Sequence, residues 1–399
     1  MKPSLFLILV LLALPAPVSA QTPVGDPIQV ASAFTGRPNG PHLLGPSVAM
    51  NSRGDFVVGW SRLKSPGGSP LSVFARLYAA DGSPRTPEIL IHGNPVHVAD
   101  TLYAVRLAMR EDGSFIAVYP APEARLLAQR FTADGKPAGP GRVVAIGFMT
   151  SFEVGIREDG GFVVAWEDLS PNVYVRVFGA DGRPVGPAFD AVTAMVGPPR
   201  LAVAPDGSFL VVWGETEIPS LNRLDSLLKG RLFHADGTPQ GPVFLISGRL
   251  SETVLAGYDT AFGEAGNFLV TWLQARFPLP RPDLSAFVRS YSPDGSPLES
   301  PKPLGSRPAG QEIAADPGGG FLSIWKGGSH EPREIVVRRF SATGGTLGPL
   351  VRLGASLPPI YSAGPVLADN GTGSFVAAWL DRAPGGKGSV LLVQRLRTE

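Results

Sequence analysis

The stretch AVAPDGSFLVVW, residues 202–213, decides the fold, because close copies of it recur along the chain. In it a short apolar run leads to the dipeptide Asp206-Gly207, and a second apolar run ends at Trp213. Asp-Gly supplies the positive φ that a tight hairpin turn requires. The stretch therefore predicts two antiparallel strands joined by a tight turn.

A second stretch, GRLFHADGTPQGP at residues 230–242, completes the unit. It predicts a third strand, another Asp-Gly turn and a fourth strand that carries Pro239 and Pro242. Proline cannot donate a hydrogen bond to a sheet, so the fourth strand must lie at an edge. Each unit is thus expected to form one four-stranded antiparallel sheet.

The chain contains seven such units, and in each a Phe stands four residues before the aromatic residue that ends the second strand. Successive units are 47 to 59 residues apart. A period near fifty with four strands per unit is typical of a β-propeller. The predicted fold is all-β, a seven-bladed propeller of four-stranded blades. The terminal aromatics are Trp60, Tyr119, Trp166, Trp213, Trp272, Trp325 and Trp379.

The two ends of the repeat array fit together. The last unit stops after its third strand, at residues 390–396, and the segment PVGDP at 23–27 repeats the fourth-strand text PVGP at 184–187. We therefore expect an N-terminal strand, residues 22–31, to complete the C-terminal blade and close the ring. Residues 21–399 would then form one domain.

Residues 1–20 have the pattern of a secretory signal peptide, with Lys2, an apolar run from Leu5 to Leu14 and the small-residue site Val18-Ser19-Ala20. The sequence predicts export to the periplasm or the medium. There is no Cys for a lipid anchor, a disulfide or a thiolate metal site. The net charge of +1 gives no reason to expect nucleic acid or membrane binding. The chain offers no metal or cofactor motif, and we expect a monomer that inserts into no membrane.

The turn Pro205-Asp206-Gly207-Ser208-Phe209 resembles those of exported bacterial propellers of the TolB or WD40-like class. The whole unit also resembles the "DGxFVVxW…ADGxPxGP" repeats of bacterial secreted and surface proteins. The resemblance covers all seven units and implies the propeller fold, but it rests on residues that build the fold. It therefore implies no particular activity.

One residue per unit, seven positions before the turn glycine, is predicted to ring the mouth of the central channel. In blades two to five the charges alternate in sign, which is the arrangement of blade-to-blade ion pairs. The same groups would also suit a polar ligand or acid–base catalysis, and both interpretations stay open. The charged candidates are Arg106, Glu153, Arg200, Asp259 and Glu312, with Ser47 and Val366 at the uncharged positions.

The connections that follow the terminal aromatics vary most in length, for example 214–229 after Trp213. Variation on one face of a repeat protein often marks a binding face, although neutral drift gives the same pattern. The candidate contact residues in these connections are Arg223, Asp225, Arg276, Phe277, Arg281 and Tyr361.

An Arg recurs two residues before the third-strand aromatic in five units, as in Arg76 and Arg231. We expect it to stack on a ring or to bond a turn carboxylate, rather than to form repeated sugar sites. For the whole chain the sequence favours an exported scaffold that binds a protein or glycan through its variable-loop face. The alternative is a polysaccharide hydrolase or lyase that uses carboxylates at the channel mouth.

Overall fold

The computed structural model describes residues 21–34, 42–63, 71–93, 105–170, 172–193, 197–220, 223–263, 265–276, 283–306, 312–316, 319–327, 333–356, 364–383 and 388–398. The expected signal peptide, residues 1–20, lies outside these ranges. Within them no helix is long and apolar enough to cross a membrane.

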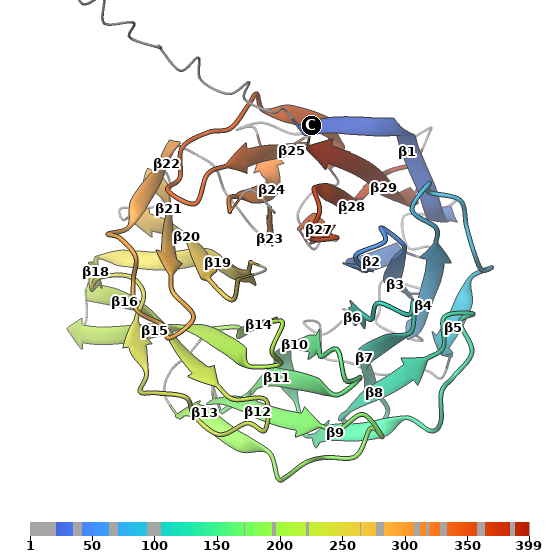
Figure 1. Ribbon diagram of the computed structural model, residues 1–399, viewed down its shortest axis with the longest axis horizontal. Helices are drawn as coiled ribbons and strands as arrows, with labels where there is room; N and C mark the ends of the chain where they lie inside the picture. Colours follow the sequence, from blue (N-terminus) through green and yellow to red (C-terminus); the bar gives the residue numbers. More distant parts are fainter. Residues whose placement is uncertain are drawn as a thin grey trace, which may run out of the picture.

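Seven antiparallel sheets stand around a central space, as Figure 1 shows, and the predicted seven-bladed propeller is confirmed. The described chain contains only strands and turns, with no helix. Blade 1 consists of β2 (His42–Met50), β3 (Phe56–Leu63), β4 (Leu71–Tyr78) and β5 (Ile89–His92). Blade 2 consists of β6 (Arg106–Met109), β7 (Phe115–Ala121), β8 (Arg125–Phe131) and β9 (Arg142–Ile146), and blade 3 of β10 (Met149–Ile156), β11 (Phe162–Asp168), β12 (Asn172–Phe178) and β13 (Phe189–Thr193).

The next three blades follow the same order from the channel outward, and blade 4 carries one extra short strand. Blade 4 consists of β14 (Arg200–Val203), β15 (Phe209–Ser220), β16 (Arg223–Phe233) and β17 (Phe244–Leu245), with β18 (Leu250–Ser251) paired to β16. Blade 5 consists of β19 (Thr253–Phe262), β20 (Phe268–Arg276), β21 (Asp283–Tyr291) and β22 (Lys302–Ser306), and blade 6 of β23 (Glu312–Ala315), β24 (Phe321–Gly327), β25 (Arg333–Phe340) and β26 (Val351–Ser356).

Blade 7 closes the ring with strands from both ends of the chain. Its order is β27 (Val366–Asp369), β28 (Ser374–Arg382), β29 (Gly388–Thr398) and then β1 (Gln21–Phe34), which pairs antiparallel with β29 from Gln21↔Thr398 to Phe34↔Gly388. Figure 1 shows β1 beside β29 at the rim. Because β1 pairs with it, β29 does not present an unpaired outer edge.

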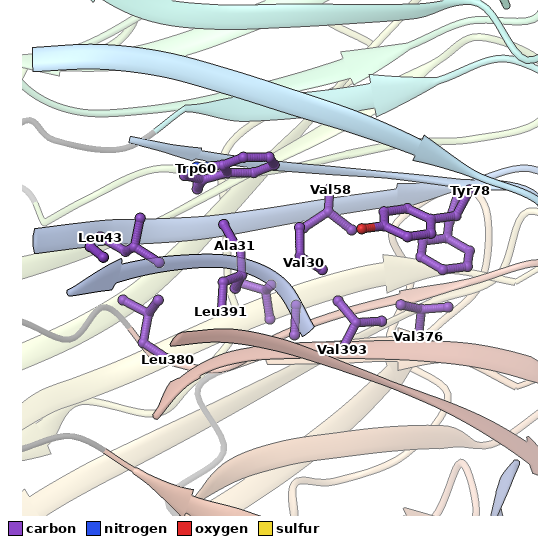
Figure 2. Close-up of a cluster of buried hydrophobic side chains, with 14 residues drawn as sticks. Val30, Ala31, Leu43, Val58, Trp60, Tyr78, Val376, Leu380, Leu391 and Val393 are labelled. Carbon is purple, nitrogen blue, oxygen red and sulfur yellow. The ribbon is translucent and has the colours of Figure 1, made fainter. Parts of the chain in front are cut away.

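The apolar second strands are explained by the contacts between neighbouring blades, which we call seams. Residues of one strand point alternately to the two seams beside it, so both sets must be apolar. In β3, Phe56, Val58 and Trp60 pack in the seam between blades 7 and 1, whereas Val57 packs in the seam between blades 1 and 2. Figure 2 shows the first of these clusters, which includes Val30 of β1 and Val393 of β29.

The repeated Phe is half of a cross-strand ring pair. Phe162 lies opposite Phe178, with centroids 4.4 Å apart and an interplanar angle of 6°. Such pairs add to the stability that burial already provides. Five other blades repeat the arrangement with Phe56–Tyr78, Phe115–Phe131, Phe209–Phe233, Phe268–Tyr291 and Phe321–Phe340.

The structure corrects the position of the outer-strand prolines. Pro84, for example, forms only an isolated bridge with Tyr78, and the regular strand β5 begins at Ile89. The residue after the proline, Arg85, donates its N–H to the carbonyl of Leu77 at 2.8 Å. Since proline has no N–H to donate, it fits a single bridge better than a continuous ladder.

Candidate functional site

The turns that join first to second strands, such as Asn51–Asp55 in blade 1, all lie at one end of the strands. We call that side of the propeller the turn face. The first strands begin on the other side, which we call the entry face. Because the strands of a blade alternate in direction, the connections that follow the terminal aromatics also lie on the entry face.

The seven predicted channel positions line one cavity of about 170 Å³, which we call the entry mouth. Each lies on the innermost strand of a different blade. The structure therefore brings together all five charged candidates. The cavity is lined by Ser47, Arg106, Glu153, Arg200, Asp259, Glu312 and Val366, with Val48, Leu107, Leu201, Thr260, Ile313 and Leu367 between them.

In blades 2 to 4 the entry mouth is held by ion pairs. Glu153 Oε2 lies 3.1 Å from Arg106 Nε, and Glu153 Oε1 lies 2.7 Å from Arg200 Nη1. One carboxylate thus bridges two guanidinium groups across two seams. Arg200 also donates its Nε–H to the carbonyl of Tyr258 in blade 5, at 3.0 Å. This half of the mouth matches the structural interpretation of the charged ring.

In blades 5 and 6 the carboxylates bond backbone instead of guanidinium groups. Asp259 Oδ2 accepts the N–H of Ile313 at 2.7 Å, and its Oδ1 accepts the N–H of Thr260 at 2.9 Å. Glu312 Oε2 accepts the N–H of Leu367 in blade 7 at 3.0 Å. Among the residues that the structure describes, no Lys, Arg or His lies within ion-pair distance of either carboxyl group.

The electrostatics of these two acids follow from that arrangement. Burial, and then the negative charge of Asp259, raises the pKa of Glu312 to about 8, although Arg200 and Arg106 oppose the shift. Burial also raises the pKa of Asp259 to about 6, opposed by Arg200. Desolvation disfavours the charge of Arg200, but the nearby carboxylates, Glu153 first, outweigh it and raise the pKa of the guanidinium. Near pH 7 the pair therefore holds about one proton between its two carboxyl groups.

Three of the six predicted variable-loop residues, Arg223, Asp225 and Arg276, lie in the part of the chain that the structure describes. The insertion 214–229 is a long hairpin rather than a loop, because β15 and β16 remain paired from Phe209↔Phe233 to Ser220↔Arg223. Arg223 lies at its tip, and Arg276 is exposed at the end of β20. Phe277, Arg281 and Tyr361 lie outside the described residues.

Asp225 is not a surface contact residue. Its side chain is wholly buried, and it accepts hydrogen bonds from Arg249 Nη1 at 3.3 Å, Ser251 Oγ at 3.3 Å and the N–H of Glu252 at 3.4 Å. Sequence reasoning missed this because the buried position depends on β18 folding back against β16. Asp225 fastens the hairpin instead of facing a partner.

The recurring arginines are structural, as expected, but they bond carbonyls rather than turn carboxylates. The Cζ of Arg76 lies 5.7 Å from the ring centroid of Tyr78, and Arg76 Nε donates to the carbonyl of Thr86 at 3.0 Å. Arg231 repeats both contacts, over Phe233 and to Gly241. Arg76, Arg231 and Arg289 thus connect the third strand to the outer segment of their own blade, whereas Arg176 donates to the carbonyl of Val144 in blade 2.

The described residues contain no group of three or more His, Cys, Asp or Glu side chains that could hold a metal ion. No family model matches the chain, and no curated protein matches it in sequence. The predicted membership of the TolB or WD40-like class therefore stays a prediction.

Solved structures do resemble it. A PL25 ulvan lyase bound to -[GlcA(1-4)Rha3S]- has a TM-score of 0.54 at 8% identity, covering 93% of this chain and 94% of the lyase. A protein of unknown function from Dyadobacter fermentans has a TM-score of 0.51 at 13% identity, covering 94% of this chain and all of its own. An α-L-arabinanase from Penicillium chrysogenum follows at a TM-score of 0.49 and 11% identity, covering 92% and 98%. At these identities the likeness to the first two structures shows a shared fold alone.

Proposed function

We propose that this protein is an exported carbohydrate-active propeller that hydrolyses a polysaccharide at the entry mouth. The observation that carries the proposal is the pair Asp259 and Glu312, two carboxyl groups on adjacent blades that line the cavity without an ion-pair partner among the described residues. Glycoside hydrolysis needs one protonated and one ionised carboxyl group beside the scissile bond. The raised pKa values, about 6 for Asp259 and about 8 for Glu312, favour one proton on the pair near pH 7, and the higher value favours Glu312 as the acid.

The roles follow from the protonation states. Glu312 would donate its proton to the glycosidic oxygen as the bond to the anomeric carbon breaks. Asp259 would either take a proton from the attacking water or attack the anomeric carbon itself. The backbone N–H groups of Ile313 and Thr260 hold the Asp259 carboxylate in place through both steps.

Hydrolysis is favoured over elimination by the state of the two arginines. A lyase must neutralise the carboxylate of a uronic acid before its neighbouring C–H becomes acidic. Arg106 and Arg200 are the cations of the mouth, and both are already paired with Glu153. The likeness to an ulvan lyase is compatible with action on a polysaccharide, but it does not select the reaction.

The test is to incubate the purified protein with neutral and uronate-containing polysaccharides and to measure new reducing ends. We expect Glu312→Gln and Asp259→Asn each to lower the rate by about 100-fold or more. Asp206→Asn, an exposed aspartate on the turn face, serves as the matched control and should leave the rate unchanged. Products with the ultraviolet absorbance of an unsaturated uronate would instead identify a lyase.

A second candidate is a scaffold that binds a protein or glycan through the entry face without cleaving it. The rigid hairpin of β15 and β16 favours it, because buried Asp225 fastens the hairpin while Ile218 near its tip is 58% exposed. A glycan or partner that binds but is never cleaved, and whose binding is lost when residues 214–229 are shortened to a tight turn, would support this candidate and count against hydrolysis.

A further inference from the structure

A site of a different kind lies on the turn face, away from the entry mouth. The site depends on which residue begins the turn between the first and second strands of each blade. The carbonyl of this residue accepts the N–H of the turn glycine, as Arg157 does from Gly160 at 2.9 Å. In the seven blades the position holds Asn51, Arg110, Arg157, Ala204, Gly263, Asp316 and Asn370.

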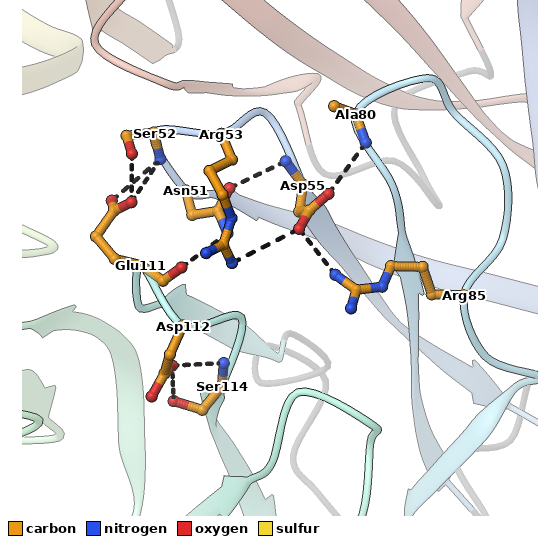
Figure 3. A network of polar contacts seen from close by, with 9 residues as sticks. All are labelled: Asn51, Ser52, Arg53, Asp55, Ala80, Arg85, Glu111, Asp112 and Ser114. Atoms are coloured by element: carbon orange, nitrogen blue, oxygen red, sulfur yellow. Dashed lines mark hydrogen bonds and ion pairs between the residues drawn. The ribbon is translucent and has the colours of Figure 1, made fainter.

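Where this residue is Asn or Arg, its side chain crosses the seam to the next blade. Asn51 Nδ2 donates to the carbonyl of Glu111 at 3.4 Å, in the network that Figure 3 shows. Asn370 Nδ2 donates to the carbonyl of Ser52 at 3.1 Å, across the seam between blades 7 and 1. These amides connect neighbouring turns directly.

The two arginines fill their seams more completely. Arg110 Nη2 donates to the carbonyl of Glu158 at 3.2 Å, and Arg157 Nη1 donates to the carbonyl of Ala235. A methyl group added to Gly160 would lie 3.5 Å from Arg110 Cζ, and one added to Gly207 would lie 3.2 Å from Arg157 Cδ. Each arginine side chain therefore packs on the turn glycine of the following blade, Arg110 with its guanidinium and Arg157 with its alkyl stem.

The seam between blades 5 and 6 lacks this side chain, because the position holds Gly263. The equivalent turn glycine of blade 6, Gly319, would have no atom of the described residues within 4 Å of an added methyl group. The space forms a pocket of about 250 Å³. Its walls are mainly small and apolar, and they include Ala261, Ala265, Phe268, Leu298, Ala315 and Ala342.

The groups that accept a guanidinium elsewhere are nevertheless present. Ala342 occupies in blade 6 the place of Ala235 in blade 4, and it lines the pocket. Its carbonyl accepts Ser290 Oγ at 2.8 Å and has a second lone pair for a further donor. Asp316 also lines it and is only 3% exposed. Its Oδ2 accepts Arg339 Nε, but its buried Oδ1 has no hydrogen-bond partner among the described residues. An unpartnered buried carboxylate oxygen is costly and favours a donor that would satisfy it.

We propose that the pocket between blades 5 and 6 binds a guanidinium group supplied from outside the chain. The guanidinium would occupy the place that the side chains of Arg110 and Arg157 fill in their own seams. It would donate to Asp316 Oδ1 and to the carbonyl side of the Ala342 turn, while its alkyl stem packs on Leu298 and Phe268. The ligand class is an arginine, either as the free amino acid or as a side chain of a polypeptide.

To test this, the whole mature protein is titrated with free L-arginine and, separately, with Nα-acetyl-L-arginine methylamide. Binding is measured by calorimetry or NMR. Tighter binding of the blocked compound would indicate an arginine in a polypeptide, and tighter binding of the free one would indicate the amino acid. The citrulline analogue, which is neutral but similar in shape, should bind at least about tenfold more weakly, because it loses a charge-assisted hydrogen bond.

The decisive variant is Gly263→Arg, which gives this seam the side chain that Arg110 and Arg157 supply in theirs. Gly263 does not have positive φ, and a Cβ there would meet only the carbonyl of Asn267 at 3.7 Å, so the residue is compatible with the backbone. We expect this variant to lose arginine binding and to keep or raise its unfolding temperature. Gly263→Ala is the matched control and should still bind.

Asp316→Asn is an independent variant and should weaken binding about tenfold or more. Equal binding of the arginine and citrulline compounds, unchanged binding by Gly263→Arg, or no binding of either arginine compound would overturn the proposal. Because the pocket lies on the turn face, none of these outcomes depends on hydrolysis at the entry mouth.

Discussion

The blade interiors and the entry mouth are both built from positions that recur in every blade, yet they are occupied in opposite ways. In the interiors the same residues return, such as the stacked Phe pairs and the buried Trp. At the entry mouth one equivalent position holds Ser47, Arg106, Glu153, Arg200, Asp259, Glu312 and Val366. The residues that recur are those that packing between blades requires. The residues that vary lie where polar side chains of different kinds can connect neighbouring blades. Substitutions should therefore affect stability in the interiors, and activity and pH dependence at the mouth.

The largest effect is expected from a repeated core residue. Trp213 is fully buried between blades 3 and 4, so Trp213→Ala removes a large apolar side chain and leaves a cavity. We expect a loss of about 3–5 kcal/mol in the free energy of unfolding, measured by urea denaturation. Cleavage at low temperature should be largely retained. The control Ile218→Ala, at an exposed position, should change stability by no more than about 0.5 kcal/mol. A loss below about 1 kcal/mol for Trp213→Ala would contradict the tight packing of the seam.

The second prediction concerns pH at the entry mouth. Glu312 must be protonated and Asp259 ionised, so cleavage should be highest between about pH 6 and pH 8 and fall about tenfold per pH unit outside that range. The free energy of unfolding should fall as pH rises. Both acids bind protons more tightly in the folded state, so their contribution to that free energy is complete at acid pH and is lost as pH rises through about 6 for Asp259 and about 8 for Glu312.

Glu312→Gln supplies the control for this pH dependence. Glutamine cannot ionise, so the variant should not lose stability through the higher of the two transitions. Parallel unfolding curves of the two proteins from pH 5 to pH 9 would show that Glu312 does not titrate in that range, and the assigned general acid would then be wrong.

Most of the fold could be predicted from the sequence because its determinants are local. A turn glycine such as Gly207 and the alternating apolar strands on either side specify a hairpin, and the period specifies the ring. The seven mouth positions could also be found, since a fixed offset from the turn glycine places each one at the start of an inner strand. Ring closure by β1 followed from the repeated proline text.

The hydrogen-bond and ion-pair partners of the mouth residues could not be predicted. They depend on which atoms of the next blade each side chain can contact. Glu153 binds two guanidinium groups, whereas Asp259 and Glu312 turn to backbone N–H groups of the next blade. The burial of Asp225 was missed for the same reason, since β18 packs on the hairpin through a contact between separate segments. The space at Gly263 could be recognised only once the seams filled by Arg110 and Arg157 were visible.

The third prediction tests the ion-paired half of the mouth. Glu153→Gln leaves Arg106 and Arg200 without their shared counter-ion in a half-buried site, and should cost about 1–3 kcal/mol of stability. It should also move the alkaline limb of the cleavage profile to lower pH, because the charge of Glu153 helps to raise the pKa of Glu312. The control is Asp112→Asn, whose exposed pair with Arg110 should contribute less than about 1 kcal/mol.

The smallest effect is expected from the uncharged half of the mouth. Ser47 is buried, and its Oγ accepts the N–H of Leu107 in blade 2 at 3.1 Å. Ser47→Ala leaves that N–H without its acceptor and should cost about 1 kcal/mol, with the pH profile of cleavage unchanged. Val366 at the equivalent position of blade 7 has no polar side-chain atom, so the ring already contains one seam without such a bond. A loss near that of Trp213→Ala would mean that the mouth, rather than the apolar seams, holds the ring together, and the contrast between the two regions would fail.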